Sequence, residues 1–305
     1  YTIGAGTAGY AGDQVSYYLR KISKRNAISI KAYEIESYVD IVGKDDVVIA
    51  FSQSGETADT LEAVETFKKN KAYICSVINM PGSTLSRMSD IFFMSNAGSE
   101  ICVASTKVFT SQISFGYLLA KSLINEYSEA KNELSILSQN LETFFNEKTF
   151  SNIKKISKLL KNKEHFFILG KGQNYHIAQE GALKIKEISY KHFEGFAAGE
   201  LKHGVIALIE KGTPVISIIS DDTNYKDMIS ATYEVKARGA LTIGVGDSKF
   251  SKENSFDYFI PVAQCSELKA VANVIPFQLI SYYLALSLGN SIDKPRNLAK
   301  SVTVK

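Results

Sequence analysis

Residues 47–60, VVIAFSQSGETADT, run from an apolar strand-like segment through a turn of small polar residues into a helical segment. A strand–turn–helix junction directs free backbone N–H groups and the positive end of the helix dipole at whatever lies in front of it. Ser52, Ser54 and Thr57 add three hydroxyl groups there, and Gly55 allows close approach to the backbone. These residues could simply cap the helix. Three hydroxyl groups around a glycine in this context favour a bound phosphate instead.

The turn at residues 52–57, the phosphate cradle below, lacks the Gly-Lys-Ser/Thr of a nucleoside triphosphate loop and therefore suits a phosphate monoester. A dinucleotide site is the rival interpretation. Residues 4–9 read GAGTAG after a strand-like segment and match G-x-G-x-x-G, and Glu34 lies where a ribose-binding acid is expected. The repeated architecture of the second half and the position of the cradle one unit later weigh against an NAD(P)-dependent dehydrogenase.

The cradle lies within a loose internal repeat. Residues 1–22 and 166–190 each read as a short strand, a Gly-x-Gly turn and a helix. Strand-like and helix-like segments alternate after both of them. Further strands are expected at residues 29–33, 46–51, 72–77, 91–94, 205–209, 214–219, 241–245 and 258–260. Such alternation predicts an α/β fold with one parallel, doubly wound sheet in each half, that is, two flavodoxin-like three-layer sandwiches.

Helical segments separate the two halves. Residues 112–125 carry apolar side chains at helical spacing, and residues 129–160 are charged and amphipathic. We therefore expect a first domain at residues 1–125, a helical linker at 126–160, a second domain at 161–288 and a C-terminal tail at 289–305. The tail contains Pro295 and has no clear period, so its composition alone predicts a frayed end.

Composition excludes several classes of protein. The formal net charge of +3 and the absence of a dense basic run argue against nucleic acid binding. No apolar run of membrane-spanning length and no signal peptide are expected. Cys75, Cys102 and Cys265 are widely spaced, so we expect no disulfide framework, no metal site and a cytoplasmic location. Because the first residue is Tyr1, we expect that a domain on its N-terminal side is missing.

Two polar features stand out in the second half. Glu180, Lys184 and Glu187 have the i, i+4, i+7 spacing of one helix face. Spacing alone favours ordinary surface salt bridges over a proton-handling site. His203 lies in the glycine-flanked loop at residues 198–204, where a histidine is a candidate acid or base.

Five segments resemble the isomerase region of the glutamine–fructose-6-phosphate aminotransferase family, also called glucosamine-6-phosphate synthases. They are residues 52–60 (SQSGETADT), 103–107 (VASTK), 180–189 (EGALKIKEIS), 199–204 (GELKHG) and 296–304 (RNLAKSVTV). The first motif is shared by sugar isomerase (SIS) domains generally. The tail motif separates this family from SIS-type deaminases and regulators. The resemblance covers essentially the whole chain and implies two SIS subdomains followed by a catalytic tail.

The resemblance also implies residues that bind fructose 6-phosphate. They are Ser52, Gln53, Ser54 and Thr57 at the phosphate, Thr7, Val103 and Ala299 at the sugar, and Ser105 beside the path of ammonia. The turn after the first strand departs from the family, which usually has Cys-Gly-Thr-Ser where this chain has Ala5-Gly6-Thr7-Ala8. The hydroxyl group that the family places at position 8 is therefore absent.

Four residues receive catalytic roles from the resemblance. His203, contributed by the neighbouring subunit of a homodimer, would open the furanose ring. Lys300 would form a Schiff base with the C2 carbonyl. Glu187 would move a proton between C1 and C2, with Lys184 beside it. This chemistry requires no metal and no organic cofactor.

The implied product is glucosamine 6-phosphate, which leads to UDP-N-acetylglucosamine. The glutaminase domain that releases ammonia from glutamine is absent from the chain, so the chain alone should not use glutamine. A SIS-type sugar-phosphate sensor or deaminase is the alternative function. A dehydrogenase is the least favoured one.

Overall fold

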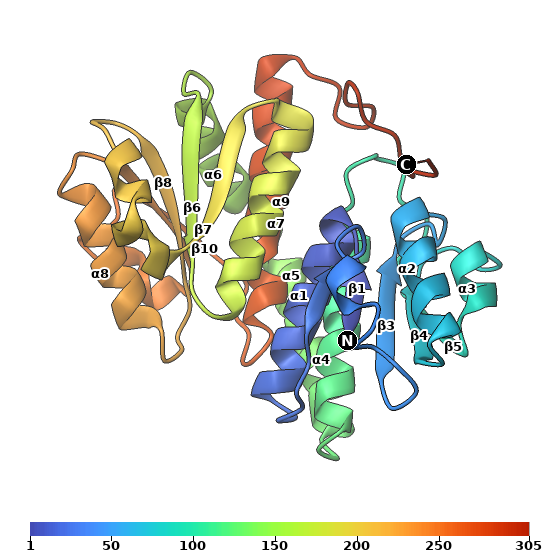
Figure 1. The fold of residues 1–305 in the computed structure, drawn as a ribbon. Helices are drawn as coiled ribbons and strands as arrows, with labels where there is room; N and C mark the ends of the chain where they lie inside the picture. Colours follow the sequence, from blue (N-terminus) through green and yellow to red (C-terminus); the bar gives the residue numbers. More distant parts are fainter. Residues whose placement is uncertain (305) are drawn as a thin grey trace. The chain divides into compact units, whose positions relative to one another are not determined.

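The computed structural model describes residues 1–304, which form two compact units. The first unit consists of Tyr1–Ala130 and the tail from Arg296 onward, and the second consists of Lys131–Pro295. The tail therefore packs with the first unit although it follows the second in the sequence. Figure 1 shows the chain coloured from the N-terminus to the C-terminus. The predicted domain boundaries at residues 125, 160 and 288 stay predictions.

The first unit contains a parallel sheet of five strands in the order β2-β1-β3-β4-β5. Its strands are β1 (Thr2–Gly4), β2 (Ser29–Lys31), β3 (Val47–Ser52), β4 (Tyr73–Ile78) and β5 (Ile91–Met94). Its helices are α1 (Gly6–Lys21), the 3-10 helix η1 (Glu36–Tyr38), α2 (Ala58–Lys69), α3 (Thr84–Met88), α4 (Lys107–Ser122) and the start of α5 (Tyr127–Phe144). In Figure 1, α1 and α4 lie on one face of the sheet and α2 and α3 on the other. This layering confirms the predicted doubly wound fold.

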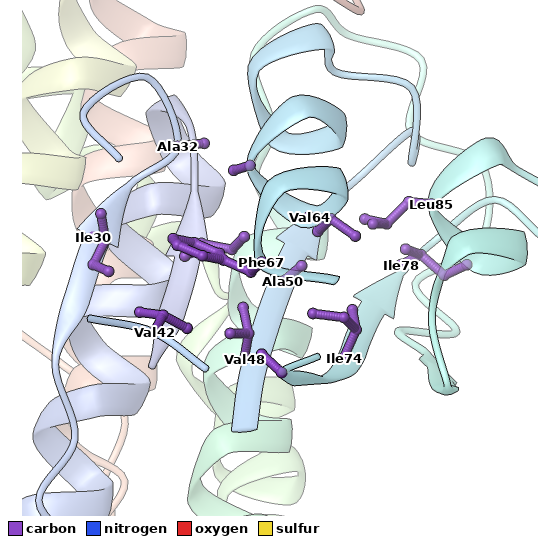
Figure 2. Close-up of a cluster of buried hydrophobic side chains, with 13 residues drawn as sticks. Ile30, Ala32, Val42, Val48, Ala50, Val64, Phe67, Ile74, Ile78 and Leu85 are labelled. Atoms are coloured by element: carbon purple, nitrogen blue, oxygen red, sulfur yellow. The ribbon is translucent and has the colours of Figure 1, made fainter. Parts of the chain in front are cut away.

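The core of the first unit follows from the alternation of side chains along each strand. Val48 and Ala50 of β3 point to the same face and pack in one cluster with Phe67 of α2, which is fully buried (Figure 2). On the other face α1 and α4 approach each other closely. A Cβ atom on Gly116 of α4 would lie 2.2 Å from Val15 of α1, so the glycine is needed for this contact.

The strand order places two turns side by side. The chain leaves β1 toward β2 on one side and returns to β3 on the other, with Ile3 paired to Ala50 in parallel register. The turn after β1 and the phosphate cradle after β3 therefore lie at the same edge of the sheet. In open α/β sheets, ligands bind at the carboxyl ends of the strands where the winding direction reverses. The fold thus places the cradle where a ligand is expected to bind.

The second unit repeats this arrangement with a parallel sheet in the order β10-β9-β8-β6-β7. Its strands are β6 (His165–Gly170), β7 (His192–Ala197), β8 (Pro214–Ile219), β9 (Leu241–Gly246) and β10 (Tyr258–Pro261). Its helices are the rest of α5, α6 (Glu147–Leu160), α7 (Gln173–Ser189), α8 (Tyr225–Lys236), α9 (Lys269–Leu288) and the 3-10 helices η2 (Ala198–His203), η3 (Val205–Leu208) and η4 (Ser248–Lys252). Helices α7 and α9 pack together, with α6 against α9, and α8 packs on β8 and β9.

One predicted strand is wrong. In place of a strand at residues 205–209 the chain forms the 3-10 helix η3 (Val205–Leu208), and the strand that completes the second sheet is β7, with the sequence HFEGFA. Gly195 interrupts the β-like pattern of this segment. A Cβ atom there would lie 2.5 Å from the backbone of Ala178 in α7, so packing of the helix on the strand requires a glycine. The amphipathic segment expected at residues 129–160 is divided between two helices, α5 and α6. Helix α6 has its own N-cap, because the side chain of Asn146 accepts a hydrogen bond from Thr149 N.

Helix α9 corrects another expectation. Among residues 1–304 it is the one helix long and apolar enough to cross a membrane by length and composition alone. Of the 18-residue window that passes this test, 61% is buried inside the protein. Helix α9 contacts α7 and α6, and Gly181 of α7 lies against Phe277. These contacts are those of a core helix.

Candidate active site

The phosphate cradle is braced from within by Ser52. Strand β3 ends at this residue, and its side chain is 2% exposed. Its hydroxyl oxygen accepts a hydrogen bond from Gly55 N at 2.9 Å and lies 3.4 Å from the hydroxyl of Thr57, the N-cap residue of α2. Ser52 therefore holds the turn in shape and is the least accessible of the predicted phosphate-binding residues.

The far side of the cradle is fixed to α3. Gly55 has φ +67°, and a Cβ atom on it would lie 2.1 Å from Ser83 Oγ, so this position requires a glycine. The Glu56 carboxylate accepts a hydrogen bond from Thr84 N at 2.7 Å. This bond from the backbone of Thr84 lowers the pKa of Glu56. The cradle is therefore a turn held in place by its contacts with Ser83 and Thr84.

The partly exposed side of the cradle is formed by Gln53, Ser54 and Thr57. The Ser54 oxygen accepts a hydrogen bond from Glu56 N at 3.1 Å. It also pairs at 2.9 Å with the hydroxyl group of Ser301, which comes from the tail.

The tail is held against the cradle, which corrects the expectation of a frayed end. It has no regular secondary structure and is largely exposed. Beside the Ser54–Ser301 pair, the carbonyl oxygen of Val302 accepts a hydrogen bond of 3.0 Å from Ala58 N at the start of α2. Lys300 Nζ donates to the carbonyl oxygen of Cys102 at 2.6 Å. The tail therefore brings a primary amine to the edge of the sheet where the cradle lies.

The segment before α4 supplies the partners of this amine. Cys102 precedes Val103, which is half-buried, and Ser105 donates a hydrogen bond to the Glu100 carboxylate at 2.8 Å. Lys300 Nζ lies 3.6 Å from the same carboxylate, whose side chain is 3% exposed. Sequence reasoning missed Glu100. The available signal was a lone acidic residue shortly before a helix, since helix N-termini attract negative charge.

The charged face of α7 in the second unit is buried. Lys184 is 1% exposed, and its Nζ lies 2.5 Å from Glu187 Oε2 and 3.7 Å from Glu180 Oε1. Surface salt bridges, which spacing alone favours, are therefore the wrong interpretation. The carboxylate of Glu187 is the partly accessible member of the group, with 18% of its side chain exposed. A carboxylate oriented by a buried lysine and open on one side has the form of a general base.

The remaining predicted residues are divided between the two units. Thr7 is in the first turn of α1, next to the end of β1, and Ala299 is exposed beside Lys300 in the tail. His203 ends the 3-10 helix η2 and is exposed on the second unit. The structure thus gathers the cradle, the segment before α4 and the tail within the first unit. Within the second unit it joins Lys184 to Glu187.

Two glycines of the GAGTAG turn, Gly4 and Gly9, serve close packing, and the third, Gly6, has a backbone conformation that favours glycine. A Cβ atom on Gly4 would lie 2.7 Å from the backbone carbon of Ala8, so α1 starts directly against the end of β1. Gly6 opens the helix with φ +55°. This geometry accounts for the glycines of the turn by the way α1 follows β1.

Comparison with known proteins agrees with this architecture. The SIS domain family matches residues 1–122 and 159–288. A glutamine–fructose-6-phosphate aminotransferase (isomerizing) of Pyrobaculum aerophilum is 42% identical over 310 residues, covering 100% of this chain and 51% of that protein. The chain spans about half the length of the curated relatives it matches.

Solved structures give the same result. The C-terminal domain of glucosamine-fructose-6-phosphate aminotransferase from Francisella tularensis is similar with a TM-score of 0.87 and 36% identity, covering 96% of this chain and 86% of that one. A glucosamine-6-phosphate deaminase from Thermotoga maritima has a TM-score of 0.81 at 24% identity, covering 99% and 89%, which is a likeness of fold alone. The chain belongs to the SIS domain family, in the group formed by the C-terminal isomerase domains of glutamine–fructose-6-phosphate aminotransferases.

Proposed function

We propose that this chain is the sugar-phosphate half of a glucosamine-6-phosphate synthase, converting fructose 6-phosphate and ammonia into glucosamine 6-phosphate. The relatives that carry this name are about twice as long, and the chain corresponds to the C-terminal domain of one of them. A glutaminase domain elsewhere in the protein would supply the ammonia. A dehydrogenase is not supported, because the chain belongs to the SIS family.

The observation that carries the proposal is the position of the tail lysine. Lys300 Nζ is held by Cys102 O, and the next residue, Ser301, pairs with Ser54 of the cradle. A protein that only binds a sugar phosphate needs a phosphate site but no primary amine next to it. An amine next to a phosphate site suits a reaction in which the carbonyl group of the bound sugar forms an imine.

The first steps use residues of the cradle and tail. Gln53, Ser54 and Thr57 bind the phosphate of fructose 6-phosphate, with the N-terminus of α2 behind them. His203 transfers a proton between the ring oxygen and the C2 hydroxyl group, which opens the furanose ring and yields the C2 ketone. The Lys300 ammonium releases a proton to solvent, the resulting amine attacks C2, and water leaves as the imine forms.

Ammonia completes the reaction by attacking C2 and displacing the Lys300 amine, which leaves an imine of ammonia on the sugar. The Glu187 carboxylate removes a proton from C1, and a C1–C2 enolamine forms. Return of a proton to C2 and loss of the C1 hydroxyl proton give the aldehyde of glucosamine 6-phosphate. Lys184, which holds Glu187, keeps this carboxylate aimed at one position. None of these steps requires a metal or an organic cofactor.

The test follows the sugars by NMR after the purified chain is mixed with fructose 6-phosphate, with and without ammonium. We expect slow interconversion with glucose 6-phosphate in both mixtures and glucosamine 6-phosphate when ammonium is present. Glu187→Gln should abolish the proton transfer, and Lys300→Ala should abolish amination. Tight sugar-phosphate binding without turnover would favour a sensor. Saturable NAD(P) binding without sugar-phosphate binding would exclude both functions.

We further propose that the enzyme acts as a homodimer in the cytoplasm. His203 is exposed on its own unit, which suits a residue that completes the site of a neighbouring subunit. Cys75, Cys102 and Cys265, all within the described residues, form no disulfide, which suits a reducing compartment. Mixing inactive His203→Ala and Glu187→Gln proteins should restore part of the activity, because a hybrid dimer contains one intact site. An unchanged lack of activity in a mixture shown to exchange subunits would contradict a shared site.

A further inference from the structure

Glu100 is a buried carboxylate to which neither the sequence motifs nor the proposed chemistry assigns a role. It lies between β5 and α4, and its side chain is 3% exposed, whereas the next residue, Ile101, is 81% exposed. A charged group is buried at this depth only where donors compensate for the lost water. The role of the Glu100 side chain can therefore be inferred from the groups that contact its two oxygen atoms.

The first oxygen of this carboxylate serves the start of helix α4. Glu100 Oε1 accepts a hydrogen bond of 2.7 Å from Thr106 N and one of 3.4 Å from Val108 N. These are N–H groups at the end of the helix where the dipole favours an anion. This part of the interaction is structural and fixes the carboxylate against a rigid element.

The second oxygen faces the tail. Glu100 Oε2 accepts a hydrogen bond from Ser105 Oγ at 2.8 Å and lies 3.6 Å from Lys300 Nζ. The same ammonium donates to Cys102 O at 2.6 Å, and Cys102 is two residues from Glu100. One short segment before α4 thus holds the tail amine from two sides, once through a carbonyl dipole and once through a full negative charge.

We propose that Glu100 is the positioning residue for Lys300: it anchors the long side chain of the tail lysine to the rigid start of α4, so that the amine meets the sugar carbonyl in one place. This inference rests on the proposed function, because it assigns Lys300 to imine formation. It adds a residue from outside the family motifs quoted above. Ser105 gains a second role, since its hydroxyl group orients the oxygen that faces Lys300.

The decisive variant is Glu100→Gln. A glutamine can still accept hydrogen bonds from Thr106 N and Val108 N, but it presents no charge to Lys300. We expect kcat for glucosamine 6-phosphate formation to fall about tenfold or more, while KM for fructose 6-phosphate stays within about twofold, because the cradle is untouched. Trapping of the Lys300 imine with sodium cyanoborohydride, measured by mass spectrometry, should slow to the same extent.

A double-mutant cycle separates positioning from a general structural effect. In a Lys300→Ala background, Glu100→Gln should cause no further loss of the residual fructose 6-phosphate to glucose 6-phosphate interconversion, since it acts through the missing amine. Glu126→Gln is the matched control. It removes the charge of another Glu–Lys pair in the same unit, with Lys121 at 2.6 Å, and should leave kcat and trapping unchanged.

Ser105→Ala provides a second, milder variant in case Glu100→Gln unfolds. It removes one hydrogen bond to the carboxylate and should lower the trapping rate about threefold. Wild-type trapping rates in the folded Glu100→Gln and Ser105→Ala proteins would overturn the inference while leaving the proposed function intact. A loss in Glu100→Gln that persists undiminished in the Lys300→Ala background would overturn it equally. Absence of both turnover and imine in the wild type would refute the proposed function itself.

Discussion

Replacement of Gly55 by alanine tests whether the cradle depends on its close contact with α3. Gly55 has φ +67°, a region that costs an alanine roughly 1–2 kcal/mol. The new Cβ atom would also lie 2.1 Å from Ser83 Oγ and 2.6 Å from Ser83 Cβ, where real contacts exceed about 3 Å. Ser83 is 6% exposed and cannot turn into solvent, so this overlap adds roughly 1–3 kcal/mol.

The expected total for Gly55→Ala is about 2–5 kcal/mol, measured as the loss in free energy of unfolding in urea. Gly82→Ala is the matched control, because Gly82 has φ +72° in the same unit but nothing lies within 4 Å of the position that an alanine Cβ would occupy. The control should lose only the backbone part, roughly 1–2 kcal/mol. The excess loss in Gly55→Ala therefore isolates the contact with Ser83.

Two further measurements connect stability to binding. Calorimetric titration with fructose 6-phosphate should show weakened binding in Gly55→Ala and wild-type binding in Gly82→Ala. Adding Ser83→Gly to Gly55→Ala removes both overlapping atoms and should restore most of the excess loss. If Gly55→Ala unfolds and binds like Gly82→Ala, the argument that the cradle is braced on α3 is refuted.

Two predictions concern titrating groups in the second unit. Burial raises the pKa of Asp222, so the folded protein binds this proton more tightly than the unfolded chain, and stability falls as pH rises above the ordinary aspartate value of about 4. Asp222→Asn should therefore raise the urea midpoint at pH 7 but not at pH 3.5, and an equal shift at both would contradict this cause. Burial raises the pKa of Cys265 to about 11, so iodoacetamide at pH 8 should alkylate Cys265 roughly a hundredfold more slowly than a free cysteine, as followed by mass spectrometry. Labelling at the free-cysteine rate would show that the thiol is exposed.

Much of the fold could be predicted because its signals are local. Apolar strands and helical periods alternate in both halves, and nine of the ten observed strands coincide with a predicted one. The missed strand, β7, contains a glycine that is explained only by the helix crossing it at Ala178. A local sequence pattern cannot reveal that packing contact. The prediction therefore assigned a strand to the apolar residues 205–209 and none to β7.

The candidate site was harder to predict because its contacts span long sequence separations. The hydrogen bond from Lys300 to Cys102 joins residues 198 positions apart. Motif resemblance identified Lys300, but the residue that faces it, Glu100, lies in no motif. Burial is equally invisible, since the spacing of Lys184 and Glu187 is the same on a surface helix as on a core helix.

The two halves of the internal repeat differ at the point where the first strand of each unit ends. In the second unit Asn174, four residues after the last glycine of β6, donates a hydrogen bond of 3.0 Å to Ser220, the residue that follows β8. Asn273 donates to Asn174 at 2.8 Å, and all three side chains are nearly fully buried. Buried side chains therefore link the start of α7 to the end of β8. At the equivalent position of the first unit, four residues after Gly4, the chain has Ala8.

Ala8 cannot make the hydrogen bond that Asn174 makes in the second unit, and its replacement should change affinity in a direction set by the size of the new side chain. Ala8→Ser adds a hydroxyl group in the turn after β1, and one hydrogen bond is worth about 0.5–1.5 kcal/mol, or roughly two- to tenfold tighter binding of fructose 6-phosphate. Ala8→Asn should instead weaken binding, because its amide would reach across to the end of β3 as Asn174 reaches the end of β8. Calorimetric titration of both variants measures the two shifts. Equal affinities in the two variants would mean that position 8 does not border the bound sugar.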